Sequence, residues 1–136
     1  MVFEEALLNH LKSQINIYNL VKDRIYPLVI PQKSEFPVIT YTKVSGERLH
    51  SLSGDTGATR PFFQISCWAD RYSDVKDLAQ KVRFCLQNHS GKIGGQSGVN
   101  VSGTLLDSES EGYDVVANKY YIHLDFQFYY IEKMGG

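Results

Sequence analysis

The chain has 136 residues, a formal net charge of −1 and a charged share of 21%. This length predicts one domain over residues 1–136, with a core that needs no disulfide. The near-zero net charge argues against a general affinity for nucleic acid or anionic membranes. No apolar run approaches the roughly 20 residues of a membrane-spanning helix. The first residues lack the positive start of a signal peptide, so we expect cytoplasmic synthesis.

Apolar residues at helical spacing predict a helix at the N-terminus. Phe3, Leu7 and Leu11 repeat on one face, and acidic residues in the first turn suit the helix dipole. The apolar spacing over 15–25 is less regular, and the prolines that follow cannot continue a helix. We therefore expect a short second helix that leads into an extended segment.

Residues 36–44 are β-branched and aromatic, which predicts a strand. The polar, glycine-containing stretch 45–59 follows and is longer than most connections in a compact domain. We interpret it as a mobile loop or as a protruding hairpin.

An alternating strand over 62–68 turns into a strongly amphipathic helix after Tyr72. The apolar residues on one face of this helix are Val75, Leu78, Ala79, Val82, Cys85 and Leu86. Cys67 on the strand and Cys85 on the helix both occupy core-facing positions, which predicts two inert buried thiols.

Glycines then punctuate a turn into a strand near 99–106, and an acidic loop is expected over 107–117. The last strand, 118–130, alternates cleanly, so one of its faces is predicted to be core. These elements predict an α+β fold. Its sheet has four to five strands, mostly antiparallel or mixed, with helices packed on one face.

The second face of this sheet combines aromatic and polar groups. Trp68, Tyr121 and Tyr129 are expected to lie there beside polar residues of the last strand. Such a mixture is enriched at protein interfaces, but a solvated face with a few exposed rings is equally compatible with it.

No catalytic or cofactor-binding motif is present in the sequence. The four histidines are scattered without metal-ligand spacing, and the glycine run 91–98 follows a helix, the reverse of a phosphate-binding loop. Neither thiol has the electropositive setting of a nucleophile. The acidic residues lack the order of a calcium-binding loop. We therefore expect no enzyme, no metal and no cofactor.

Several short segments form a series along the chain: 23–27, 36–41, 45–47, 63–69, 72–79, 82–83 and the alternating final strand. In this order and spacing the sequence resembles the tail-completion, or tail-terminator, proteins of long-tailed bacteriophages and prophages, which are also called tail-to-head joining proteins. The resemblance covers most of the chain.

The resemblance implies a structural virion protein of the tail and head–tail interface, assembled in the host cytoplasm. Family members form a ring, usually of six subunits, which caps the tail tube, stops its elongation and joins the head connector. The implied partners are further copies of the chain, the tail tube protein and the connector protein, with DNA only passing through the lumen and no membrane. Ring closure that depends on the tube as a template would leave the free protein a monomer in solution.

Two sets of residues are expected to matter for this assembly. Candidate interface residues are Arg48, His50, Asp55, Arg60, Trp68, Tyr121 and Tyr129. Candidate lumen residues, whose acidic side chains would let DNA slide, are Asp107, Glu109, Glu111 and Asp114. Two alternatives remain open from the sequence: another phage neck or tail ring protein, or a small α+β ligand-binding domain, which would need a concave pocket.

Overall fold

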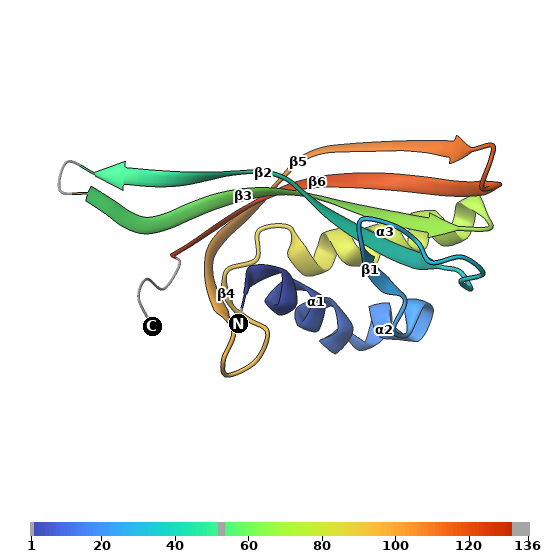
Figure 1. Ribbon diagram of the computed structural model, residues 1–136. Helices are drawn as coiled ribbons and strands as arrows, with labels where there is room; N and C mark the ends of the chain where they lie inside the picture. Colours follow the sequence, from blue (N-terminus) through green and yellow to red (C-terminus); the bar gives the residue numbers. More distant parts are fainter. Residues whose placement is uncertain (1, 52–53, 132–136) are drawn as a thin grey trace.

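A six-stranded sheet covered on one face by three helices makes up the computed structural model (Figure 1). The structure describes the backbone of residues 2–51 and 54–131. It describes the side chains of these residues except those within 47–57. The elements are α1 (Phe3–Ser13), α2 (Ile15–Val21), β1 (Ile25–Pro27), β2 (Val38–Ser51), β3 (Gly54–Ala69), α3 (Tyr72–Leu86), β4 (Gly91–Ile93), β5 (Val99–Asp114) and β6 (Lys119–Ile131). In the described part of the chain, no helix is long and apolar enough to cross a membrane.

The strand order is β1-β2-β3-β6-β5-β4. Only β1 and β2 pair in parallel, and every other neighbouring pair is antiparallel. The expected α+β class and the helices on one face are confirmed, while the expected count of four to five strands was too low. The two extra strands, β1 and β4, are each only 3 residues long and carry too little periodicity to be recognised.

The core lies between the sheet and the helices. Phe3 of α1 places its ring 5.3 Å from that of Phe63, 5.0 Å from that of Phe128 and 4.9 Å from that of Tyr130. From α3, the buried residues are Val75, Leu78, Ala79, Val82 and Leu86. Aromatic rings and aliphatic side chains thus join the N-terminal and C-terminal parts of the chain in one hydrophobic cluster.

The described residues of the stretch 45–59, which are 45–51 and 54–59, belong to two paired strands, so of the two interpretations the hairpin is confirmed. Strands β2 and β3 pair from Val38 with Trp68 as far as Ser51 with Gly54, with register shifts after Lys43 and Arg48. The far halves of both strands extend past the helical layer, toward the left in Figure 1.

The prediction of an acidic loop over 107–117 was wrong. Strand β5 continues through Asp114, which pairs with Lys119 of β6. The turn between the two strands is short, and the acidic side chains are carried by a strand. Polar residues that alternate on a half-exposed strand look like a loop when the sequence is read by composition.

A candidate assembly surface on the open face of the sheet

Side chains of β2, β3, β5 and β6 that point away from the helices form a surface that we call the open face. Along β6 the alternation expected from the sequence holds: Ile122, Leu124, Phe126 and Phe128 are buried, and the residues between them are half-buried. The members with described contacts are Thr40, Arg60, Phe62, Gln64, Ser66, Trp68, Asp107, Ser108, Tyr121, His123, Asp125, Gln127 and Tyr129. No described helix covers this face (Figure 1).

Aromatic rings cluster at one end of the open face. The rings of Trp68 and Tyr121 lie 5.3 Å apart, and the His123 ring lies 4.5 Å from that of Tyr121. The Trp68 indole Nε1 donates a hydrogen bond to Thr40 Oγ1 at 3.1 Å, and Ser66 Oγ lies 2.6 Å from His123 Nδ1. These contacts hold the rings in defined positions while they stay partly exposed, which is how aromatic anchors of interfaces are arranged.

His123 is held neutral by its surroundings. Burial lowers the pKa of this imidazole below its ordinary value, and the nearby Asp125 carboxylate opposes the shift only in part. The Ser66 and His123 pair does not form a catalytic triad, because both Asp125 oxygens bind elsewhere: Gln64 Nε2 donates to one at 3.1 Å and Ser108 Oγ to the other at 2.6 Å. The Asp125 carboxylate on β6 thus orients side chains from the two neighbouring strands, β3 and β5, and does not orient the His123 imidazole as a catalytic base.

A second hydrogen-bonded chain continues the open face toward the hairpin. Gln127 Nε2 donates to both Asp107 carboxylate oxygens at 2.7 and 2.8 Å, and Tyr129 OH donates to Gln127 Oε1 at 3.0 Å. The Arg60 guanidinium contacts Tyr129 OH at 3.5 Å and lies over the rings of Phe62 and Tyr129. The open face is therefore a preorganised surface of rings, amides and few charges, suited to contact another macromolecule.

The predicted interface residues fall into three places. Trp68 and Tyr121 meet at the aromatic end, and Arg60 and Tyr129 meet near the hairpin. Arg48, His50 and Asp55 belong to the hairpin strands, where Arg48 pairs with Thr59 and His50 with Asp55 through the backbone, but their side chains lie outside the described part.

The predicted lumen residues do not form one wall. Asp107 joins the open face through Gln127, whereas Glu109 and Glu111 lie opposite Leu124 and Ile122 on the helix side. Glu111 accepts hydrogen bonds from Tyr72 OH at 2.6 Å and Lys76 Nζ at 3.1 Å, which lower the pKa of its carboxyl.

Asp114 lies at the turn, where its carboxylate accepts from the Ala117 backbone N–H. Asp107, Glu109 and Glu111 would share one face of a regular strand, but the irregularity between Leu106 and Ser108 shifts the register of β5 and turns Asp107 to the open face.

Sequence reasoning missed the polar residues that tie the rings together. Gln64, Ser66 and Thr40 were read only as members of strands, and Ser108 as part of a loop. The signal was available on β3, where Phe62, Gln64, Ser66 and Trp68 alternate with buried residues and so share the face of Trp68.

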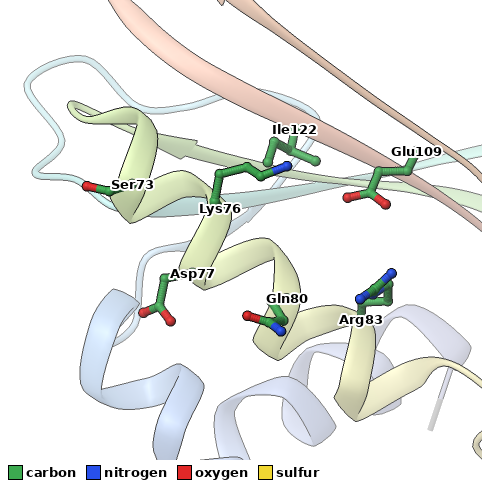
Figure 2. Close-up of a pocket in the computed structure, with 7 residues that line it drawn as sticks. All are labelled: Ser73, Lys76, Asp77, Gln80, Arg83, Glu109 and Ile122. Carbon is green, nitrogen blue, oxygen red and sulfur yellow. The ribbon is translucent and has the colours of Figure 1, made fainter.

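A groove of about 590 Å³ runs between α3 and strands β5 and β6 (Figure 2). Its lining residues are Ser73, Lys76, Asp77, Gln80, Arg83, Glu109 and Ile122. Lys76 and Arg83 reach toward the strands, but Ser73 and Asp77 point away from them in Figure 2. Lys76, Arg83 and Glu109 face the groove (Figure 2), and the Lys76 ammonium is already bound to the Glu111 carboxylate at 3.1 Å. In the described part of the chain, no group of three or more His, Cys, Asp or Glu residues could hold a metal ion.

Two other titratable groups of the core bear on reactivity. Both cysteines are free, with Cys67 fully buried and Cys85 partly so. Burial raises the pKa of Cys67 strongly and that of Cys85 to about 11, so both remain thiols at neutral pH. The expectation of inert thiols agrees with this geometry.

Comparison with known proteins places this fold in context. Residues 5–128 match the family described as tail completion protein gp17. A chain in a solved structure of the virion of a native gene transfer agent (GTA) particle superimposes with a TM-score of 0.72 at 16% identity, over 90% of this chain and 89% of that one. This likeness shows the fold alone. Among curated proteins, none matches the chain.

Proposed function

Because this chain belongs to the tail completion protein gp17 family, we propose that it closes into a ring, usually of six subunits, that caps the phage tail tube. The ring stops tail elongation and joins the tail to the head connector. The family is one of structural virion tail proteins and not of enzymes. Assembly takes place in the host cytoplasm, and the free subunit is a monomer wherever closure needs the tube as a template.

The family match is the observation that carries this proposal. It extends from α1 into β6 and thus includes the helices, the hairpin and the open face. A tube of stacked rings grows because each ring presents the same surface as the last. Growth stops when a ring fits the tube on one side and presents a different surface on the other.

The open face and the hairpin supply the contacts in this proposal. The rings of Trp68 and Tyr121 and the Arg60–Tyr129 pair provide anchors that are already ordered, which lowers the entropy cost of assembly. The hairpin residues Arg48, His50 and Asp55 extend the contact area beyond the helical layer.

We propose that Asp107, midway along the open face, faces the lumen, and that the aromatic end and the hairpin end of this face lie at the two openings of the ring. Glu109 and Glu111 lie on the helix side, and Asp114 lies at a turn, so they are left out of the lumen wall. A lumen without clustered basic groups lets DNA pass without binding, because phosphate affinity depends on Lys and Arg.

Head–tail joining in a mixture of purified parts tests the proposal. Heads and tails made in a background that lacks the gene are mixed with the purified chain, and joined particles are counted by electron microscopy. We expect joining with the wild type and little with a Trp68→Ala, Tyr121→Ala variant.

The matched control is Phe84→Ala. Phe84 is also an aromatic residue, but it is 67% exposed and lies on α3, away from the open face. Joining that is independent of the added chain would refute the proposal. If Phe84→Ala lost as much joining activity as the Trp68→Ala, Tyr121→Ala variant, the proposed role of the open face would be wrong.

A further inference from the structure

Two long strand edges lack a partner in the described part of the chain. Strand β4 covers β5 only opposite Val99–Val101, and the backbone N–H of Asn88 takes the Thr104 carbonyl, which leaves the outer edge of 105–114 without a strand. On the opposite margin, β1 covers β2 at 39–41, which leaves the outer edge of 42–51 without one.

The β5 edge carries acidic side chains and one bulge, but no other protection of the kind that natural sheets use. Exposed edges are usually blunted by charged side chains, especially lysine, by proline, by bulges or by a covering element. The segment 105–114 contains neither lysine nor proline, and its one irregularity lies between Leu106 and Ser108. The contacts of α3 with this segment run through the Glu111 side chain and leave the strand edge uncovered. Its backbone groups are therefore available to a further strand.

We propose that the outer edge of β5 in one copy pairs with the outer edge of β2 in a second copy of this chain, so that the sheet continues from subunit to subunit. This inference rests on the ring proposed above and specifies how its subunits join. Strand directions allow it: β2, β3, β6 and β5 alternate in direction across the sheet. Neighbouring copies in one continued sheet would therefore meet as an antiparallel pair.

Length and charge also match between the two edges. The free segments 105–114 and 42–51 are equally long. The β5 segment carries only acidic charges, from Asp107, Glu109, Glu111 and Asp114, while the β2 segment carries Lys43 and Arg48 with a single acid, Glu47. Opposite charges on paired strands favour this pairing, whereas two β5 edges would place acids against acids.

Such pairing is heterologous, because two different surfaces meet, and it can repeat until a ring closes. All helices then lie on one side of the continued sheet and all open faces on the other. A curled sheet that closes with its helices outside would carry Asp107 on its inner wall and place the aromatic end and the hairpin at its two openings, where the tube and the connector bind.

Engineered cysteines test the pairing in a Cys85→Ser background, where the remaining thiol of Cys67 is buried. Ser110→Cys on β5 is combined in one chain with a cysteine at Thr42, Val44 or Ser45 on β2, since a disulfide forms only where Cα atoms come within about 7 Å. Each double variant is oxidised alone at high concentration and after recovery with tails. Products are separated by denaturing electrophoresis.

We expect at least one double variant to give a ladder of covalent multimers, while each single variant stays monomeric. The control double variant carries Gln80→Cys, at an exposed position on α3, in place of Ser110→Cys. This control should give no ladder. Absence of a ladder in both samples would overturn the inference, and so would efficient dimers from Ser110→Cys alone.

The test also separates the inference from the proposed function. If the wild type joins heads to tails but no ladder forms, only the edge pairing is wrong. If a ladder forms but joining fails, the pairing stands and the tail role does not.

Discussion

Replacing Leu78 on α3 by alanine tests whether α3 packs on the buried face of the sheet, which is the face opposite the open face. Leu78 is 0% exposed and lies in the core cluster between α3 and the strands. The substitution removes the Cγ and both Cδ carbons of Leu78. Burial of each carbon contributes about 0.8 kcal/mol, so together they contribute about 2.4 kcal/mol. The cavity adds roughly 1 kcal/mol. We expect the free energy of unfolding to fall by about 3–4 kcal/mol.

Urea unfolding measures this loss. With an m-value of about 2 kcal/mol/M, the midpoint should fall by roughly 1.5–2 M while m stays unchanged. Gln80→Ala, on the exposed side of the same helix, is the matched control and should change stability by less than about 0.5 kcal/mol. A loss below about 1 kcal/mol for Leu78→Ala would refute the packing of α3 on the sheet, and with it the assignment of the open face.

Three further results are expected. Trp68→Ala should lower the free energy of unfolding by no more than roughly 1–2 kcal/mol, because the ring is half-buried, yet abolish head–tail joining; a fully active variant would contradict the role of the aromatic end. In the folded protein, burial and the neighbouring His89 lower the pKa of His10. As the pH falls, His10 is therefore protonated at a higher pH in the unfolded chain than in the folded protein. Stability should therefore fall as the pH drops below 6.5, and less so in His10→Gln; identical pH profiles in urea titrations would contradict this. Iodoacetamide should label Cys67 and Cys85 only after unfolding, and fast labelling of the native protein, measured by mass spectrometry, would show that the thiols are accessible.

The sequence predicts the parts of this fold that have strong periodicity. The helical repeat through Val75, Leu78 and Val82 and the strand alternation through Ile122 and Leu124 depend only on local spacing, and both are confirmed. Cross-strand partners depend on register, which no local pattern encodes. The parallel pairing of Ile25 with Ile39 therefore could not be predicted.

The sequence predicts on which face of the sheet the aromatic residues of the candidate site lie. It does not predict which of these residues contact one another. Trp68, Tyr121 and Tyr129 could be assigned to one face from alternation alone. That Trp68 meets Tyr121 while Arg60 meets Tyr129 follows from the antiparallel register of β3 and β6. The acidic residues were grouped by composition, and the bulge between Leu106 and Ser108, which no local pattern predicts, separates Asp107 from Glu109 and Glu111.

The most direct test of the central claim is the length distribution of tails, measured by electron microscopy, from a phage or prophage background that lacks this gene. We expect overlong, headless tails, and tails of normal length once the purified chain is present during assembly. Tails of normal length without heads would point instead to a neck protein that joins without terminating. Normal tails on normal heads would contradict the account.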